Sequence, residues 1–439
     1  MIKGFFLFIS VLTVGMLQGR AQRLLTLEEA IATTLQNNFQ IQLARNDSMI
    51  AAIDYGYRDA VFLPSLNATI GRTFSSNSQR QTLADSSERK SNNVRSNNIQ
   101  GNVALNWVLF DGLKMFATRE KADALLEAGT YTAREQVINT VATVINTYYS
   151  VARQQQLVKA TDMQIKLNEE RVKLAQYNLD IGTGAKPDVL QSRVDLNAQK
   201  VQKMQQQTTI AQLKEQLAQA MNSGIKPEEF ELRDSIPLGE PISLGSLYEG
   251  LETANPAMLL AKSQIRIAEL SLKESLADRY PVVSFNSAYN YSRLENNRAV
   301  NPSSLLFNKT YGYNFGFSAS IPIFNQFRVK RQIQQDRLNL RYQNTLYDNQ
   351  LSILRLSVTN AWQDYEQQRR ILSMEEENIV YAEELVNIEM AKYRMGMATM
   401  VQLREAQLSL SQAYDRLIAA RYNYKTAETE LLRLRGTLL

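Results

Sequence analysis

Residues 137–179 read VINTVATVINTYYSVARQQQLVKATDMQIKLNEERVKLAQYNL. Apolar side chains recur in this stretch every seven positions, at Val137, Val144, Val151, Val158, Ile165, Val172 and Leu179. A seven-residue period sustained over this length is typical of helices that supercoil around neighbouring helices. The surrounding segment, about 113–181, contains no proline, and as one helix it would span about 100 Å at ~1.5 Å per residue. Because no single globular core encloses such a helix, the sequence predicts a mainly helical protein built from long coiled-coil helices.

The chain is internally duplicated. The seven-residue stripe returns 214 positions later, at Leu351, Val358, Tyr365, Leu372, Ile379, Val386 and Tyr393, within a second long segment of about 328–395. Pro64 also matches Pro281, 217 positions away, and Phe110 matches Phe324. We therefore expect a first repeat over 22–230, a linker or equatorial region over 231–245 and a second repeat over 246–439.

Both long helical segments end at a glycine, Gly182 or Gly396, and a shorter helix is expected to return from each, over about 187–221 and 399–434. The first end, DIGTGAKPD (180–188), has the glycines and lysine of a phosphate-binding loop. However, it follows a helix rather than a strand, lacks the G-x-x-x-x-G-K-[ST] spacing, and has a counterpart, MGMATMVQL, without the lysine. It is therefore interpreted as a helix stop, for which glycine is the preferred residue.

Each repeat also contains two segments with a period of two, which predict strands over about 65–75 and 98–110 and over about 282–292 and 311–322. In the last of these, Tyr311, Tyr313, Phe315 and Phe317 alternate with Gly312, Asn314, Gly316 and Ser318. Such strands suit a half-buried sheet of a soluble protein or a membrane β-barrel with a polar lumen. The joining segments, 75–98 and 292–310, are rich in Ser, Asn and Arg, and aromatic residues crowd the strand ends, which favours the barrel.

Four strands are too few to close a barrel, and an open sheet in a bilayer leaves two edges of unpaired backbone groups. The chain is therefore expected to oligomerise. Two copies would supply eight strands, whose side chains fill the interior, and three copies would supply twelve, with room for a lumen.

The composition excludes several classes of chemistry. The 439 residues include neither cysteine nor histidine, which removes thiol nucleophiles, Cys/His zinc sites and the commonest general base. The net charge of +5 is scattered, so no nucleic-acid surface is expected. The EEE run at 375–377 is best interpreted as a solvated helix face or as part of interhelical salt bridges. We expect no enzyme, cofactor or metal site.

The first 21 residues have a lysine, then an apolar stretch, then small residues before Gln22, which is typical of a cleaved signal peptide (1–21). An uncleaved N-terminal anchor is the alternative. No later apolar run reaches the ~18 residues of a transmembrane helix. The mature chain is therefore expected to be exported, and to enter a membrane only as strands.

Several motifs together resemble the TolC-type outer-membrane factor family. They are the signal peptide, the duplicated plan, LPSL and YPVV at strand starts, W-x-L-F-D-G and I-P-I-F-N at hairpin ends, and AKYRMGMATMVQL at 391–403. The resemblance implies a homotrimer with a twelve-stranded β-barrel in the outer membrane of a Gram-negative bacterium and a twelve-helix tunnel across the periplasm. It also implies a periplasmic adaptor protein and an inner-membrane pump as partners, besides the lipid of the outer membrane.

In that family an acidic ring above the second tip forms the periplasmic gate. The matching positions here are Asn387 and Met390, which are not acidic, whereas the nearby glutamates Glu383, Glu384 and Glu389 are alternatives, with Glu389 nearest the tip. Each of these glutamates would serve only if its helix turns it toward the tunnel rather than outward. The resemblance also implies adaptor docking at the hairpin tips, at Gly182, Thr183, Gly184, Gly396, Ala398 and Thr399.

The expected function is a passive outer-membrane exit duct of an efflux or type I secretion system. The alternative is a soluble periplasmic coiled-coil adaptor or spacer without a pore, which would need a core against one face of the strands. The sequence does not indicate the cargo.

Overall fold

The computed structural model describes residues 23–239, 241–299 and 304–438, so the expected signal peptide at 1–21 lies outside the described residues. The chain forms two compact units. Unit 1 contains the residues up to Leu43 together with Gln136–Leu251 and Leu354–Leu439, and unit 2 contains Ala44–Glu135 and Glu252–Ile353.

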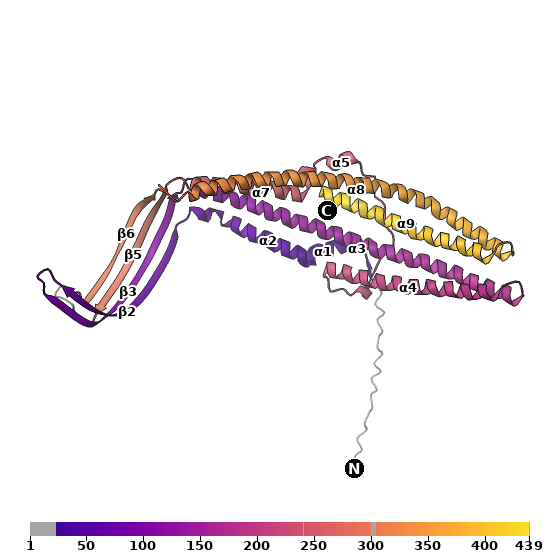
Figure 1. Cartoon of the computed structure of the whole chain (residues 1–439), viewed down its shortest axis with the longest axis horizontal. Helices are drawn as coiled ribbons and strands as arrows, with labels where there is room; N and C mark the ends of the chain where they lie inside the picture. Colours follow the sequence, from indigo (N-terminus) through magenta and orange to yellow (C-terminus); the bar gives the residue numbers. More distant parts are fainter. Residues whose placement is uncertain (1–22, 240, 300–303, 439) are drawn as a thin grey trace, which may run out of the picture. The chain divides into compact units, whose positions relative to one another are not determined.

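Two very long helices and two return helices dominate the chain (Figure 1). The long helices α3 (Lys114–Asp180) and α8 (Arg328–Arg394) have 67 residues each. The return helices α4 (Lys186–Met221) and α9 (Met400–Arg435) have 36 residues each. The equal lengths in the two halves reflect the sequence duplication. The shorter helices are α1 (Leu27–Asn37), α2 (Phe39–Gly56), α5 (Leu244–Tyr248), α6 (Leu251–Ala254) and α7 (Pro256–Ala277).

Unit 1 has two main apolar clusters, one for each repeat. In the first, Val144 and Val151 of α3 pack with Leu217 of α4 and with Phe230 of the short strand β4 (Phe230–Leu232). In the second, Val358 and Tyr365 of α8 pack with Leu417, Tyr424 and Leu431 of α9. Burial of each such side chain stabilises the fold by about 1.5–3 kcal/mol.

The apolar stripe of α8 is buried as its seven-residue period indicates, with Tyr365, Leu372 and Val386 at most 4% exposed. The stripe of α3 departs from expectation in its second half. There Val158, Ile165, Val172 and Leu179 are only half-buried, and the buried positions lie beside them at Thr161, Gln164, Asn168, Arg171 and Ala175. Of the polar side chains in this seam, Arg171 has partners on both α4 and α9.

The segment between the repeats belongs to unit 1 and is held by a short strand pairing and by side chains that donate to backbone carbonyl groups. Strand β4 pairs in parallel with β1 (Arg23–Leu25), and Lys214 of α4 donates from Nζ to the carbonyl oxygen of Phe230 at 2.7 Å. Asn222, which ends α4 with a left-handed backbone (φ 46°), donates to the carbonyl oxygen of Asn37 at 2.9 Å. The C-terminal end of α4 thereby meets the C-terminal end of α1. The expected linker, 231–245, contains most of β4 and the start of α5.

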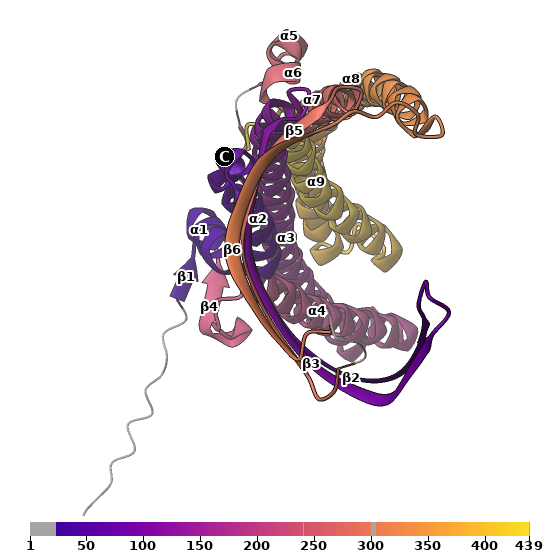
Figure 2. The same ribbon diagram turned by 90° about the vertical axis from the view of Figure 1, so that its left-hand side faces the viewer.

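Unit 2 contains a four-stranded antiparallel sheet in the order β2-β3-β5-β6, which Figure 2 shows as strongly curved. The strands are β2 (Ser65–Thr82), β3 (Glu88–Phe110), β5 (Val282–Asn296) and β6 (Phe307–Ser320). They extend well into the segments 75–98 and 292–310, which we expected to be loops. The Ser- and Asn-rich residues of β2 and β3 pair through their backbones, with one irregularity between Asn77 and Gln79. The pairing continues to Thr82, so the turn of the first hairpin follows that residue.

The helical part of unit 2 is tied together by polar contacts between α3 and α7. Lys121 forms an ion pair with Glu274 at 2.8 Å, and Arg266 forms one with Glu120 at 2.9 Å. The turn from β3 into α3 needs Gly112, which has a φ of +75° and whose Cβ, if present, would lie 2.5 Å from the carbonyl oxygen of Ala277. Within the described residues, every helix is too short or too polar to be a membrane span.

Candidate functional site: the helical hairpin tips

The first hairpin tip is closed by the carbonyl oxygen of Asn178. The backbone N–H groups of Thr183 and Gly184 donate to it at 2.9 and 2.8 Å, and the Thr183 hydroxyl donates at 3.2 Å. Gly182 has a φ of +80°, and a Cβ on Gly184 would lie 2.9 Å from Asn178 and from the nitrogen of Leu179. Both glycines are therefore required by the turn, for different reasons.

At the second tip, α8 ends with a different hydrogen-bond pattern, and α9 begins with a side-chain cap that α4 lacks. Gly396 has a φ of +74°, and the N–H of Met397 donates to the carbonyl oxygen of Lys392 at 2.9 Å. Thr399 then begins α9 with a reciprocal capping box, in which its hydroxyl accepts from the Gln402 N–H and the Gln402 side chain accepts from the Thr399 N–H. Such caps satisfy backbone groups that the helix end would leave without partners.

The predicted docking residues are not equally accessible. Gly182, Thr183, Gly396 and Thr399 are exposed, whereas Gly184 and Ala398 are half-buried. Ala398 packs against a small cluster of Met390, Tyr393 and Leu403. The sequence interpretation missed three large apolar side chains that are exposed at the tips, Ile181 (54%), Met395 (61%) and Met397 (68%).

The two hairpins of one chain contact each other near their tips. Arg394 of α8 lies 3.1 Å from Glu170 of α3, and Leu167 and Leu174 of α3 pack against the cluster of Met390, Tyr393 and Leu403. Burial raises the pKa of the Tyr393 hydroxyl. The tips are therefore joined by both apolar and ionic contacts.

The five predicted gate residues lie in different surroundings. Met390 is buried in the tip cluster, 7% exposed. Glu383 accepts from the hydroxyl of Tyr414 on α9 at 2.5 Å, and burial, followed by this bond, raises the pKa of Tyr414 to about 12. Glu389 is paired with Lys392 at 2.7 Å, with 14% of its side chain exposed. Glu383, Glu384 and Asn387 are exposed, and within the described residues the side chains of Glu384 and Asn387, one helical turn apart, have no hydrogen-bond or ion-pair partner.

A buried arginine, Arg171, joins three helices and was not singled out from the sequence. Its Nη2 atom lies 2.6 Å from Oδ2 of Asp195 on α4, and its Nη1 atom donates to Oε1 of Gln407 on α9 at 3.0 Å. Burial lowers the pKa of the Arg171 guanidinium, and Asp195 opposes that shift. A cavity of about 150 Å³ adjoins it, and the Nε2 atoms of Gln164 and Gln407 are buried there without a partner among the described residues. The only signal in the sequence was a polar seam beside the apolar stripe of α3.

Solved structures with this arrangement of elements are outer-membrane channels. The outer membrane protein VceC from Vibrio cholerae superposes with a TM-score of 0.75 at 17% identity, over 93% of this chain and 96% of that chain. The CmeC outer membrane channel of Campylobacter jejuni superposes with a TM-score of 0.77 at 13% identity, over 94% of this chain and 86% of that chain. The expected fold class, long coiled-coil helices with a four-stranded barrel portion in each chain, is thereby confirmed.

The family model described as "Outer membrane efflux protein" matches residues 30–223 and 247–437, one segment in each repeat. The chain belongs to this family. The family is one of transport proteins, and the expected role as an outer-membrane exit duct agrees with it.

Named relatives match between 80% and 94% of the chain. The toluene efflux pump outer membrane protein TtgC of Pseudomonas putida is 23% identical over 428 residues, covering 93% of this chain and 82% of that protein. The outer membrane protein TolC of Escherichia coli is 21% identical over 359 residues, covering 80% and 72%. The alkaline protease secretion protein AprF of Pseudomonas aeruginosa is 21% identical over 436 residues, covering 94% and 87%.

Proposed function

We propose that three copies of this chain form an exit duct in the outer membrane of a Gram-negative bacterium, with a large periplasmic extension. The observation that carries the proposal is the aromatic face of β6. Its members are 66–77% exposed within the described chain, at Tyr311, Tyr313, Phe315 and Phe317. A sheet face this apolar is stable against lipid rather than water.

The two edges of the sheet support closure between copies. All three pairings are antiparallel, so the edge strands β2 and β6 run in opposite directions. The β2 edge of one copy is therefore suited to antiparallel pairing with the β6 edge of the next copy. Three copies supply twelve strands and leave no edge in the hydrocarbon, where each unpaired backbone group costs several kcal/mol.

The absence of native cysteine makes this closure testable by disulfide cross-linking. Each variant carries one cysteine in β2, between residues 66 and 74, and one in β6, between residues 309 and 317. Some of these variants should form covalent trimers on non-reducing gels. The matched control places the β2 partner at Val103 in β3, an interior strand, and should give no cross-link. Only monomers for all edge pairs in the membrane-inserted protein would contradict the trimeric closure.

Conduction is tested on the purified protein in planar bilayers. A duct gives discrete single-channel steps, whereas a soluble periplasmic spacer gives none and stays in the soluble fraction after osmotic shock. We found no observation that favours the spacer, because its sheet would need a core over the β6 aromatic face and, within the described residues, no part of the chain covers it.

We infer that the exposed pair Glu384 and Asn387 supplies the polar constriction of the gate. Glu389 and Glu383 already hold partners, and Met390 is buried. Three symmetry copies of one unpaired carboxylate would form an acidic ring that attracts cations. We therefore expect Glu384→Gln to lower the cation preference of the channel, measured as a reversal potential in a salt gradient. Glu389→Gln is the matched control and should change the reversal potential less.

We propose that the tips dock a periplasmic adaptor protein that connects the duct to an inner-membrane pump. The exposed apolar residues Ile181, Met395 and Met397 would give that contact its hydrophobic part. Met397→Lys should prevent co-purification of the adaptor while leaving the conductance of the isolated channel unchanged. Leu408→Lys, on α9 and 58% exposed but away from the tip, is the control.

We expect the pump and the adaptor, rather than the duct, to determine which cargo is transported. Relatives are named for toluene efflux and for alkaline protease secretion, which are very different cargoes. We propose that the duct is permissive and that pump and adaptor select the substrate.

A further inference from the structure

The apolar face of the sheet ends in a row of cations. Strand register places Arg72, Ile99, Arg293 and Lys309 opposite one another across β2, β3, β5 and β6, so their side chains leave the same face. Three of these four side chains are basic and exposed, and we call Arg72, Arg293 and Lys309 the cation row.

The rows that follow toward the helix-connected ends of the strands are apolar or small. On this face the side chains include Ile70, Tyr291 and Tyr311, then Val103, Tyr289 and Tyr313, then Leu66, Leu105 and Phe315. The last row holds Trp107, Phe285 and Phe317.

Trp107 lies eight positions from Ile99 on β3. That separation is about 27 Å along a strand, or roughly 20 Å across a bilayer for a strand tilted by about 40°. The cation row therefore lies at the hairpin-side margin of a band that fits the hydrocarbon thickness of an outer membrane, about 25 Å.

Each basic side chain is held over an aromatic ring. The Arg72 guanidinium lies 4.4 Å from the ring centroid of Phe74. Lys309 lies 5.8 and 5.7 Å from the rings of Tyr291 and Tyr311, and Arg293 lies 5.7 Å from Phe307. This geometry keeps the stems against apolar surface and the charges at its rim.

A single acid partly balances these charges. Arg293 donates from Nε to Glu295 at 2.9 Å. Arg72 donates to Asn97 at 2.9 Å, and Asn97 in turn donates to Glu295 at 3.2 Å. Within the described part of the chain, neither Arg72 nor Lys309 has an ion pair. The three bases and one acid leave a local charge of +2.

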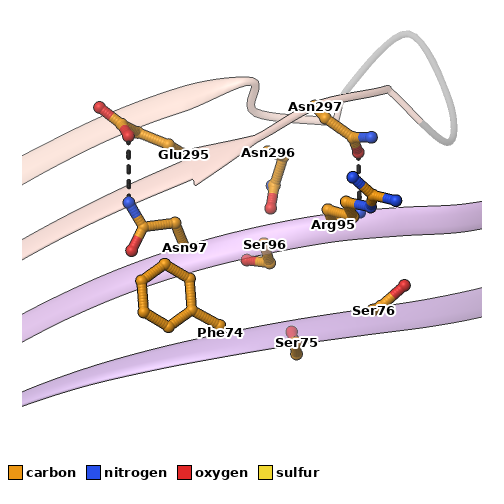
Figure 3. A pocket seen from close by; sticks show the side chains of 9 residues that line it. All are labelled: Phe74, Ser75, Ser76, Arg95, Ser96, Asn97, Glu295, Asn296 and Asn297. Carbon is orange, nitrogen blue, oxygen red and sulfur yellow. Dashed lines mark hydrogen bonds between the residues drawn. The ribbon is translucent and has the colours of Figure 1, made fainter.

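A hollow of about 490 Å³ lies beside the row on its hairpin side (Figure 3). Phe74, Asn97 and Glu295 line the hollow on one face of the sheet. Arg95 and Asn297 line it closer to the hairpin ends, where the Arg95 backbone N–H donates to Oδ1 of Asn297 at 2.7 Å. An aromatic ring with amides and a carboxylate suits hydroxyl-bearing groups, because it offers both stacking surface and hydrogen-bond partners.

We propose that the cation row binds the phosphate groups of an outer-leaflet glycolipid, with its acyl chains on the aromatic face and its sugar headgroup in the adjoining hollow. The inference rests on the proposed function, because it requires this face to lie in the membrane. Charge complementarity carries it, since cations at the margin of an apolar band attract phosphate-bearing headgroups.

The test uses the full chain in detergent, with lipid A as the probe and dephosphorylated lipid A as its partner, and measures binding by native mass spectrometry. Arg72→Gln together with Lys309→Gln removes two charges and leaves the Arg293–Glu295 pair intact. We expect this variant to bind lipid A about 30-fold more weakly, and the wild-type chain to prefer phosphorylated lipid A by a similar factor.

The matched control is Arg80→Gln with Lys90→Gln. These residues are opposite each other near the hairpin end, and their replacement removes the same total charge. This control should retain lipid A binding within about twofold, well inside the ~30-fold loss expected of the row variant. Equal loss in both variants, or equal binding of the two lipids, would overturn the inference, as would release of lipid A by millimolar inorganic phosphate.

Channel conductance of the same preparations separates the two proposals. If the wild-type chain conducts but does not discriminate between the lipids, the lipid site fails and the duct stands. If it forms no channel in any bilayer, the duct fails, and the lipid site fails with it.

Discussion

Arg171 of α3 and Asp195 of α4 form an ion pair of 2.6 Å in which only 2% of the arginine side chain is exposed. Arg404 of α9 lies 3.3 Å from the same carboxylate, so one aspartate joins three helices. This polar contact lies in the part of unit 1 nearest the proposed docking tips.

Removing Arg171 should be strongly destabilising. Arg171→Ala removes the buried charge partner of Asp195, which keeps Arg404 and the amide of Gln191, and opens space in a packed seam. We therefore expect the free energy of unfolding to fall by about 3–5 kcal/mol. Chemical denaturation followed by circular dichroism at 222 nm measures it. Lys200→Ala, which breaks an exposed pair with Glu169 at 3.8 Å, should cost less than about 1 kcal/mol. Similar losses for both variants would contradict the structural role of Arg171.

Tyr365 and Tyr424 should be coupled in the core between α8 and α9. Their hydroxyl oxygens lie 2.8 Å apart and their ring centroids 5.0 Å apart. A double-mutant cycle of Tyr365→Phe and Tyr424→Phe should give a coupling energy of about 1 kcal/mol, because each single change leaves a buried hydroxyl without this partner. The more exposed pair Tyr248 and Thr359, at 2.6 Å, is the comparison and should couple more weakly. Additive effects in the core pair would refute the prediction.

The three tip glycines should differ in their tolerance of alanine. Gly182 and Gly396 need only a left-handed backbone, and nothing lies within 4 Å of a Cβ added to either. Gly182→Ala and Gly396→Ala should each cost about 1–2 kcal/mol. Gly184→Ala places a Cβ 2.9 Å from the backbone of α3, so it should cost more and should disorder the tip. Hydrogen exchange at residues 178–185 measures the effect for the Gly182 and Gly184 variants, and exchange at residues 392–399 measures it for the Gly396 variant. An equal increase at the altered tip in all three variants would count against the prediction.

Tyr149 should contribute to stability below pH 10 and lose that contribution in alkali. Burial, followed by the neighbouring Tyr148, raises the pKa of Tyr149 from 10.0 to about 12. The folded state therefore holds this proton more tightly, and stability declines as the pH rises from about 10 to about 12. Between pH 9 and pH 11.5 the free energy of unfolding should fall in both chains. We expect this fall to be smaller in Tyr149→Phe than in the wild-type chain, by on the order of 1–2 kcal/mol. Tyr177→Phe, at a position that is 60% exposed, is the control and should follow the wild-type curve.

The parts of the fold that depend on periodicity could be predicted from the sequence. The stripe through Val358, Tyr365 and Val386 predicts the buried face of α8, because a repeat of seven keeps the same side of a helix against its neighbour. The alternation from Tyr311 to Phe317 likewise predicts β6, because successive side chains of a strand point to opposite faces.

Other features could not be predicted from the pattern. The Ser- and Asn-rich residues after Phe74 have no apolar alternation, yet they continue β2 to Thr82, because the backbone of β3 pairs with them. The buried position of Arg171 also has no signature of its own, since an arginine on a helix is usually exposed.

The sequence by itself determined the duplicated plan, the long helices, their glycine stops and the period-two strands, because all of these follow from local periodicity and backbone preference. Only the tertiary structure decided which polar groups meet. Glu383 accepts from Tyr414 while Glu384, also exposed, has no side-chain partner among the described residues, and Arg72, Arg293 and Lys309 share one row although more than 200 positions separate the first from the other two. The physical reason is that helix rotation and strand register bring together residues that are far apart along the chain.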